Sequence, residues 1–350
     1  MKGVAIGDLL LPTDIIEKIF HGDTIKKYVD GYEAVTFKVE SRSAIRNTWR
    51  QFEEHGPSGV PCPPNIAEVV KDAEILAVHI CPVNNEMIQS AKNLKIILTA
   101  RGGLENIDIN EATKRKIPVI NTPNHNSEAV AEYTIGLILS ETRNISRSHY
   151  ALKNGIWQEH YSNSSYIPEI NELKVGIVGF GANGQLVSQK LKAFNCEILV
   201  SDPYISDKEI IKEGFTPVKL EELLKQADII SLHVRLNSQT ANMISEKEFK
   251  LMKSSAYLIN CARAGLVNSE ALFQALKNET IQGAAIDVYE SEPITKDNPL
   301  LNLDNITLTN HRAGDTRASY WNAPNLMRGE LLKFLNGERP KYIANKEVLK

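Results

Sequence analysis

A glycine-rich hexapeptide near the middle of the chain constrains its fold more than any other feature. The hexapeptide is Gly179-Phe180-Gly181-Ala182-Asn183-Gly184. An apolar run over residues 173–178 precedes it, and a helix-like stretch over residues 185–194 follows it. A second apolar run over residues 196–200 leads to Asp202. Strand, glycine turn, helix, strand and acid in this order indicate a βαβ unit, and the pattern is a dinucleotide-binding fingerprint.

Each glycine of the fingerprint has its own physical task. Gly179 permits the tight turn after the strand, Gly181 lets a pyrophosphate approach the backbone, and Gly184 lets helix and strand pack closely. The phosphates then lie at a helix N-terminus, where free N–H groups and the helix dipole favour an anion. We therefore expect Gly179, Gly181, Asn183 and Gly184 to bind a dinucleotide. The alternative is a tight βα turn that binds no ligand.

Asp202 indicates which dinucleotide binds. It lies 18 residues past Gly184, at the end of the second strand. A carboxylate at this place accepts hydrogen bonds from the adenosine ribose hydroxyls and repels the 2′-phosphate of NADP. Residues 203–205 include no arginine that would hold that phosphate. The sequence therefore favours NAD as the cofactor, unless Asp202 only caps its own turn.

The composition excludes several classes of partner. The chain has 350 residues and a formal net charge of −3, so no global field attracts nucleic acid or an anionic membrane. No apolar run reaches the ~18 residues that span a bilayer, and the N-terminus meets Asp8 too soon for a signal peptide. The four cysteines show no zinc-binding spacing, so we expect no metal site and reduced thiols in a cytoplasmic protein.

Apolar runs alternate with helix-like stretches through most of the chain, which predicts an α/β protein with parallel sheets. The fingerprint begins late, so a separate domain precedes it. We expect residues 1–122 and 322–350 to form a substrate-binding domain. Residues 123–321 would form a Rossmann domain that binds NAD and is inserted in the first.

Three further segments complete this prediction. A buried helix is expected over residues 127–152, where it fits a subunit or domain interface or, equally well, the core of one domain. A last helix over residues 323–335 would pack back on the first domain. The polar stretch over residues 41–64 fits no strand and is expected to be a helical insertion or a loop.

Polar side chains follow three successive predicted strands of the second domain. Arg263 follows the first, Asp287 ends the second with Glu292 in the loop beyond it, and His311 follows the third. Taken singly, each of these side chains could have a purely structural role instead of a catalytic one, such as a surface ion pair. Ligands bind at the carboxyl ends of strands in open α/β sheets. Because all three strands deliver polar groups to that edge, we expect a catalytic site there.

With these motifs the chain resembles the D-isomer-specific 2-hydroxyacid dehydrogenase family, which includes D-lactate, phosphoglycerate, glyoxylate/hydroxypyruvate and formate dehydrogenases. The resemblance extends from about residue 75 to residue 337. The matching stretches are residues 94–97 with 106–108, residues 128–132, the fingerprint with Asp202, residues 227–233, and the three segments that carry Arg263, Asp287 with Glu292, and His311.

The resemblance implies a role for each matching residue and a two-domain fold with Rossmann-like and flavodoxin-like parallel sheets. It also implies a homodimer. The catalytic residues would be Arg263, Glu292 and His311, the cofactor would contact His233 and Asp287, and the substrate carboxylate would bind the loop Arg101-Gly102-Gly103.

The chemistry fits these residue types. Oxidation of a 2-hydroxy acid needs a base for the hydroxyl proton, and the pKa of histidine is near neutrality. Glu292 would hydrogen-bond the other ring nitrogen of His311 and fix its tautomer. Arg263 would bind the carboxylate and polarise the C2 oxygen. Formate has no hydroxyl proton to remove, and the members of the family that oxidise formate carry glutamine in place of this glutamate. Glu292 therefore argues against formate oxidation.

Two arginines depart from the family pattern and bear on the substrate. Arg101 stands where a small residue is usual, and Arg312 directly follows His311. Either one would pair with a second anionic group of the substrate, a phosphate or a carboxylate. The alternative is that both make structural ion pairs or point to solvent.

The sequence therefore predicts an NAD-dependent oxidoreductase that acts on the CH–OH group of a D-2-hydroxy acid or on the corresponding 2-keto acid. One alternative is an NAD(H)-sensing, corepressor-like regulatory protein of the same fold. Another is a phosphite- or formate-type dehydrogenase.

Replacement of Asp202 tests the choice of NAD. Hydrogen bonds to a charged group contribute roughly 1.5–3 kcal/mol. In Asp202→Ala the ratio of kcat/KM with NADH to kcat/KM with NADPH should therefore fall about ten- to a hundredfold. Steady-state kinetics with both cofactors measures this ratio, and an unchanged ratio would contradict the assignment.

Overall fold

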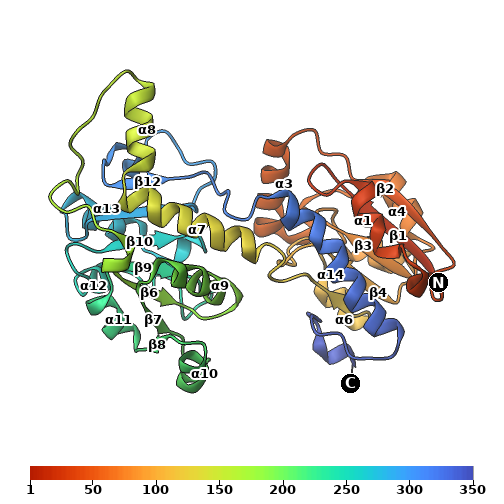
Figure 1. The fold of residues 1–350 in the computed structure, drawn as a ribbon. Helices are drawn as coiled ribbons and strands as arrows, with labels where there is room; N and C mark the ends of the chain where they lie inside the picture. The colour runs from red at the N-terminus through yellow and green to blue at the C-terminus, as the bar shows by residue number, and fades with distance from the viewer. Residues whose placement is uncertain (350) are drawn as a thin grey trace. The chain divides into compact units, whose positions relative to one another are not determined.

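The computed structural model of the protein describes residues 1–349. The chain divides into two compact units. Unit 1 comprises Met1–Asn126 and the segment from Thr316 onward, and unit 2 comprises Ser127–Asp315. Each unit contains one parallel sheet with helices, and unit 2 is inserted in the sequence of unit 1 (Figure 1). The predicted α/β class with two parallel sheets is confirmed.

Unit 1 contains a five-stranded parallel sheet in the order β2-β1-β3-β4-β5. This is the flavodoxin-like order of a doubly wound sheet. Successive side chains of a strand point to opposite faces, so Val4 and Ile6 enter one core and Ala5 enters the other. The strands are β1 (Lys2–Gly7), β2 (Gly31–Thr36), β3 (Ile75–Val78), β4 (Ile96–Thr99) and β5 (Val119–Ile120).

Helices supply the other half of both cores of unit 1. One core receives side chains from α3, α4, α5 and α6, and the other from α1, η1 and α14. The elements are α1 (Thr13–Ile16), η1 (Glu17–Phe20), α2 (Asp23–Lys26), α3 (Arg42–His55), η2 (Gly56–Gly59), α4 (Pro64–Val70), α5 (Asn85–Ser90), α6 (Ile109–Lys114), α14 (Arg317–Leu335) and η7 (Lys346–Leu349). Among residues 1–349, no helix is both long and apolar enough to cross a membrane.

Two helices of unit 1 settle open points of the sequence analysis. The stretch over residues 41–64 contains α3, which Ser41 caps at its N-terminus and whose buried residues are Ile45 and Phe52. The last helix begins at Arg317, not at residue 323, because Thr316 caps it and Pro324 lies inside it. Proline removes one helical hydrogen bond. Burial of Ala323, Met327 and Leu331 against the N-terminal elements offsets this cost.

Unit 2 contains a seven-stranded parallel sheet in the order β12-β11-β10-β9-β6-β7-β8. The strand that starts the glycine fingerprint, β6, lies between β9 and β7, which is the Rossmann arrangement. The strands are β6 (Lys174–Val178), β7 (Glu197–Ser201), β8 (Thr216–Pro217), β9 (Ile229–Leu232), β10 (Tyr257–Asn260), β11 (Gly283–Ile286) and β12 (Ile306–Leu308).

Helices cover both faces of this sheet. The core on one face includes residues of α11, α12 and α13, and the core on the other includes residues of α7 and α9. The elements are α7 (Ser127–Thr142), α8 (Ile145–Lys153), η3 (Ile170–Glu172), α9 (Ala182–Leu191), η4 (Lys192–Phe194), α10 (Asp207–Lys212), α11 (Leu220–Gln226), α12 (Glu246–Phe249), η5 (Ala264–Leu266), α13 (Ser269–Lys277) and η6 (Pro299–Asn302).

The single helix predicted over residues 127–152 is two helices, and that prediction was wrong. Asn144 separates α7 from α8 with a left-handed backbone (φ 56°), which asparagine tolerates better than most residues. Beside the break, Glu141 accepts hydrogen bonds from Arg147 (2.7 Å) and from Thr307 of β12 (2.6 Å). α7 packs on α9 and on strands β10, β11 and β12, so it lies in the core of unit 2.

Candidate active site

Parallel strands of unit 2 end level with one another at one edge of the sheet. Asn260 of β10 pairs with Ile286 of β11, which pairs with Leu308 of β12. The residues that follow these strands therefore come out side by side. In order across the sheet, the predicted site residues at this edge are His311 after β12, Asp287 and Glu292 after β11, Arg263 after β10, His233 after β9, Gly179 after β6 and Asp202 after β7.

His311 and Glu292 form a hydrogen-bonded ion pair at this edge. The Nδ1 atom of His311 lies 2.8 Å from Oε2 and 3.0 Å from Oε1 of Glu292. Because the carboxylate only accepts, Nδ1–H is the donor, and Nε2 remains for a proton of a substrate. The hydrogen bond with Glu292 raises the pKa of His311, whereas burial and, to a smaller extent, the charge of Arg263 oppose this rise. The imidazole is 49% exposed, so a small molecule reaches it.

Asp287 holds the turn that carries His311. Its side chain is fully buried, and its carboxylate accepts hydrogen bonds from the Thr309 hydroxyl (2.6 Å) and from the backbone N–H groups of Arg312 (2.9 Å) and Ala313 (2.8 Å). These donors flank His311 on both sides. The backbone of His311 is left-handed (φ 55°), a conformation that costs free energy and needs such support. In this structure the Asp287 carboxylate is thus engaged with the turn that carries His311.

Arg263 lies in an ordered loop at the end of β10. The Asn260 side chain donates to the Arg263 carbonyl (3.0 Å) and accepts from the Ala262 N–H (3.0 Å), which fixes the path of the loop. The guanidinium is exposed and donates to the Ala262 carbonyl at 2.7 Å. Arg263 follows β10 at the same edge of the sheet as His311, and a guanidinium suits a carboxylate.

The glycine loop has the shape that a pyrophosphate requires. Gly179 has φ 93°, and a Cβ there would lie 2.9 Å from the His233 carbonyl oxygen. A Cβ on Gly184 would lie 2.0 Å from the Gly179 carbonyl oxygen, whereas a Cβ on Gly181 would meet nothing within 4 Å. No side chain caps the N-terminus of α9, and the buried Oδ1 atom of Asn183 has no hydrogen-bond partner. Free donors, open space and an unpaired polar atom fit a bound dinucleotide.

Asp202 follows β7 and His233 follows β9, the two strands that flank β6 and its glycine loop. The Asp202 carboxylate accepts hydrogen bonds from the N–H groups of Phe180 (2.7 Å) and Tyr204 (2.8 Å), which ties the end of β7 to the glycine loop. A carboxylate has about four acceptor positions, so it retains capacity for a ribose hydroxyl. His233 lies 2.9 Å from the Ser231 hydroxyl, and burial lowers the pKa of His233 to about 4, so it is neutral.

The loop Arg101-Gly102-Gly103 follows β4 in unit 1. The Arg101 guanidinium donates to Glu105 (3.2 Å), and lies 5.8 Å from the centre of the Trp49 ring. A Cβ on Gly103 would lie 2.3 Å from the Glu105 carboxylate, so the glycine lets Glu105 reach Arg101. In unit 2, Arg312 is paired with Asp315 at 2.6 Å. Both extra arginines therefore have carboxylate partners in this structure.

The sequence analysis missed a buried acid–histidine pair at the carboxyl edge of the unit 1 sheet. His79 Nδ1 lies 2.8 Å from Asp8 Oδ2, and both side chains are almost fully buried. Burial alone would raise the pKa of Asp8, but His79 and backbone N–H donors lower it overall. The signal was available, because Asp8 directly follows β1 and His79 directly follows β3. The strand-end rule that selected His311 applies equally to these two residues.

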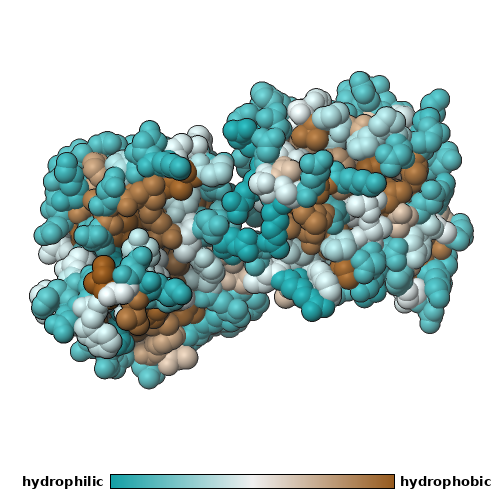
Figure 2. All heavy atoms as spheres, turned by 90° about the horizontal axis from the view of Figure 1, so that it is seen from above, coloured by the Kyte–Doolittle hydropathy of each residue, from teal (hydrophilic) through white to brown (hydrophobic). Residues whose placement is uncertain are grey.

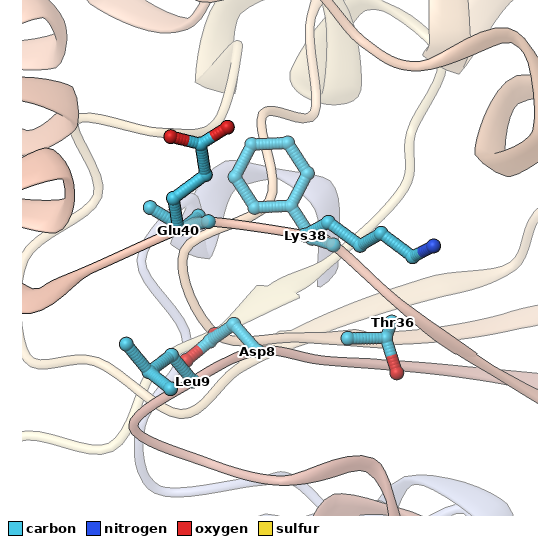
Figure 3. A pocket seen from close by; sticks show the side chains of 7 residues that line it. Asp8, Leu9, Thr36, Lys38 and Glu40 are labelled. Carbon is cyan, nitrogen blue, oxygen red and sulfur yellow. The ribbon is translucent and has the colours of Figure 1, made fainter.

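A cavity of about 360 Å³ adjoins this pair. It is lined by Asp8 and Leu9 after β1 and by the chain from Thr36 to Glu40 at the end of β2. Figure 3 shows Asp8 and Leu9 on one side, with Lys38 and Glu40 on the other. The predicted catalytic side chains do not line it, so we treat it as a feature of unit 1 alone.

Strand order, glycine loop and polar edge together define unit 2 as the nucleotide-binding unit of an NAD-dependent oxidoreductase. Residues 135–313 match the family model described as D-isomer specific 2-hydroxyacid dehydrogenase, NAD binding domain. The chain therefore belongs to the D-isomer specific 2-hydroxyacid dehydrogenase family, and the resemblance, the enzyme class and NAD as cofactor are confirmed.

Individual relatives agree with this assignment. The chain is 37% identical over 295 residues to a glyoxylate reductase of Thermofilum pendens, a match that covers 82% of this chain and 87% of the relative. It is 38% identical over 282 residues to a D-3-phosphoglycerate dehydrogenase of Methanocaldococcus jannaschii, but this match covers 80% of this chain and only 53% of that longer protein. The chain thus spans about half of the phosphoglycerate dehydrogenase and most of the glyoxylate reductase.

A solved structure supports the fold. The NAD-complexed D-isomer specific 2-hydroxyacid dehydrogenase of Lactobacillus delbrueckii ssp. bulgaricus superposes with a TM-score of 0.76, at 23% identity, over 98% of this chain and 100% of that chain. At this identity the likeness concerns the two-domain architecture alone.

Two glycines of the loop provide a matched test of the cofactor cradle. Gly184→Ala places a methyl group against the Gly179 backbone, so it should lower the unfolding free energy by about 1–3 kcal/mol. Gly181→Ala meets open space, so its unfolding free energy should change by less than about 0.5 kcal/mol, while its KM for NADH rises because the methyl group occupies the approach of the pyrophosphate. Thermal denaturation and steady-state kinetics measure both. Equal losses of stability would contradict this account of the loop.

Proposed function

We propose that this protein interconverts a small 2-keto acid and its D-2-hydroxy acid with NAD(H), with His311, Glu292 and Arg263 as the catalytic residues. The observation that carries this proposal is the His311–Glu292 pair, 2.8 Å apart, at the edge that also bears the glycine loop. NAD supplies or accepts the hydride when it is bound. The protein must then move one proton and stabilise one developing negative charge on oxygen.

The proton is handled at Nε2 of His311. Glu292 holds Nδ1–H, which keeps Nε2 as the atom that accepts the hydroxyl proton during oxidation and returns it during reduction. The same contact stabilises the imidazolium that forms, which agrees with the raised pKa of His311. Arg263, whose charge acts on this imidazole, binds the carboxylate and polarises the C2 oxygen.

We assign the remaining contacts as follows. Gly179, Gly181, Asn183 and Gly184 hold the pyrophosphate, Asp202 accepts from the adenosine ribose, and His233 contacts the cofactor as a neutral ring. Asp287 supports the nicotinamide side through the turn that it holds. Unit 1 is the substrate-binding domain, in which the backbone N–H groups of Gly102 and Gly103 bind the substrate carboxylate.

The substrate class follows from the charges that are already paired. Arg101 has Glu105 as its partner and Arg312 has Asp315. Neither guanidinium is left uncompensated for a second anionic group, so the geometry favours a substrate with one carboxylate. A glyoxylate reductase that matches this chain over most of its own length supports the same class. Glyoxylate is therefore the first substrate to test, and a phosphorylated acid is the alternative.

We also propose that the protein is a cytoplasmic homodimer. The exposed apolar side chains Ile145, Tyr150, Leu152, Ile156 and Trp157 lie on α8 and just after it, and Trp157 is 80% exposed. Figure 2 shows hydrophobic side chains on the face of unit 2 from which α8 rises in Figure 1. A second copy of the chain would cover such a patch. Free thiols at all four cysteines agree with a reducing compartment.

A substrate panel with a catalytic variant tests the function. NADH oxidation is followed with glyoxylate, pyruvate, hydroxypyruvate and 3-phosphohydroxypyruvate, and kcat/KM should be higher for the single-carboxylate acids. His311→Ala should lower kcat by roughly 10²–10⁴-fold, whereas the exposed His55→Ala should leave it unchanged. Absence of turnover on every acid by a folded, NADH-binding protein would refute the proposal and favour a regulatory role.

The pH dependence tests the pairing of His311 with Glu292. Reduction needs protonated His311, so the rate should fall as the pH rises through the raised pKa of His311. Glu292→Gln removes the charge that raises this pKa, and the fall should move to lower pH. The pair also stabilises the folded protein, and this contribution likewise decreases with rising pH. It is complete below the unfolded pKa of His311, about 6.5, and is lost as the pH rises through the folded pKa of His311.

Glu290→Gln is the matched control for this experiment, because Glu290 is an exposed carboxylate in the same loop. Its pH–rate profile should coincide with that of the unmodified enzyme. A profile of Glu292→Gln that also coincides with it would exclude the proposed role of Glu292.

A further inference from the structure

Tyr289 lies at the polar edge of unit 2, between residues that carry the proposed chemistry. It belongs to the loop after β11, past Asp287 and before Glu292. Its ring is half-buried and packs against the core on one face of the sheet. Its hydroxyl donates to the carbonyl oxygen of Thr309, directly after β12, at 2.8 Å, and a second carbonyl oxygen, that of Ile286, lies 3.2 Å away. The loop after β11 is thereby tied to the end of β12.

This tyrosine is bonded on both sides of the acid–histidine pair. The backbone N–H of Tyr289 donates to Oε1 of Glu292 at 3.1 Å, and the same oxygen lies 3.0 Å from Nδ1 of His311. The hydroxyl of Tyr289 holds the carbonyl of Thr309, which begins the turn that carries the imidazole. Tyr289 therefore links the carboxylate to the turn of the histidine by a path that is separate from the hydrogen bond between them.

The turn needs this donor in addition to Asp287. The Asp287 carboxylate accepts hydrogen bonds from the Thr309 hydroxyl and from two backbone N–H groups after His311, but a carboxylate only accepts and so cannot hold the Thr309 carbonyl. Burial raises the pKa of Tyr289, and the charge of Asp287 raises it further, so its hydroxyl keeps its proton at neutral pH. The left-handed backbone of His311 (φ 55°) is held in place only by such surrounding contacts.

We propose that Tyr289 is a positioning residue, whose hydroxyl fixes the turn of His311 so that the imidazole stays against the Glu292 carboxylate. Tyr289 acts through this pair and exchanges no proton with the substrate. The inference rests on the proposed function for the reaction that the pair performs, whereas the position of the pair is measurable without any turnover.

Tyr289→Phe isolates the contribution of the hydroxyl. Phenylalanine keeps the ring in the core and keeps the backbone N–H, so only the donor to the turn is lost. The charged groups that act on the pKa of His311 are Glu292, Asp287 and Arg263, and the variant retains all three. A change in the pKa of His311 in this variant therefore reports a change in position.

The first experiment is an NMR titration of the full chain with ¹³C-labelled histidine, in which His311→Ala identifies the signal of His311. The hydrogen bond with Glu292 raises the pKa of His311, so a looser pair should move the midpoint of the His311 titration to lower pH in Tyr289→Phe. Glu292→Gln, which removes the charge, should move this midpoint further. An unchanged midpoint in Tyr289→Phe would overturn the proposal whether or not the protein reduces a 2-keto acid.

Tyr257→Phe is the matched control. Tyr257 is the first residue of β10, at the opposite edge of the same sheet, and its buried hydroxyl accepts a hydrogen bond from the Asn163 amide at 3.0 Å. Both variants lose one tyrosine hydrogen bond and should fold with a lower melting temperature, as circular dichroism checks. Only Tyr289→Phe should move the His311 midpoint. Equal shifts in both variants would mean that the hydroxyl acts through stability alone, which contradicts a positioning role.

Kinetics with the 2-keto acids separates this inference from the proposed function. In Tyr289→Phe, kcat should fall about two- to tenfold, the rate equivalent of one neutral hydrogen bond, while KM for NADH stays unchanged. In Glu292→Gln the further change Tyr289→Phe should lower kcat no more, because the hydroxyl acts through this pair. Additive losses of kcat would overturn the proposal. A shifted His311 midpoint in a protein without turnover would support the role of Tyr289 and contradict only the proposed function.

Discussion

Parallel strand pairing is the constraint on which the rest of this structure depends. In a parallel sheet every carboxyl end emerges at the same edge, so residues from distant parts of the sequence arrive together without any direct pairing between their loops. In unit 2 this edge collects the glycine loop, Arg263, Glu292 and His311. In unit 1 it collects Asp8, His79 and the loop at Arg101. One geometric rule therefore supplies two polar edges.

Within unit 2, hydrogen bonds to one buried and one partly exposed carboxylate convert this proximity into a defined geometry. Asp287 holds the backbone on both sides of His311, and Glu292 holds its ring through Nδ1. The buried carboxylate costs desolvation energy, which its three donor groups offset. The exposed imidazole thus rests on a buried support, and this division lets a single side chain stay accessible and still keep one orientation.

Local features of the structure were the most predictable from the sequence. Gly179 and Gly184 are required by a positive φ and by a close backbone contact within the same βα turn. The strand ends before Arg263 and His311 followed from apolar runs. The bond between Glu292 and His311 did not follow from these runs, because 18 residues separate the two side chains in sequence, and it was assigned only through family resemblance.

Features that depend on packing between distant segments were the ones that the sequence analysis missed. The apolar pattern over residues 127–152 is continuous, yet Asn144 breaks the helix where Glu141 meets Arg147 and Thr307. The last helix was expected to begin at residue 323, yet it begins at Arg317, and α14 continues through Pro324 while it packs on the N-terminal elements.

By itself, the sequence determined the fold class, the dinucleotide loop and the strand ends that carry the polar side chains, because these depend on residues close together along the chain. Only the tertiary structure decided which charges are already paired, because the conformation of the loops brings the partners into contact. The pairs are Arg101 with Glu105, Arg312 with Asp315, and Asp8 with His79.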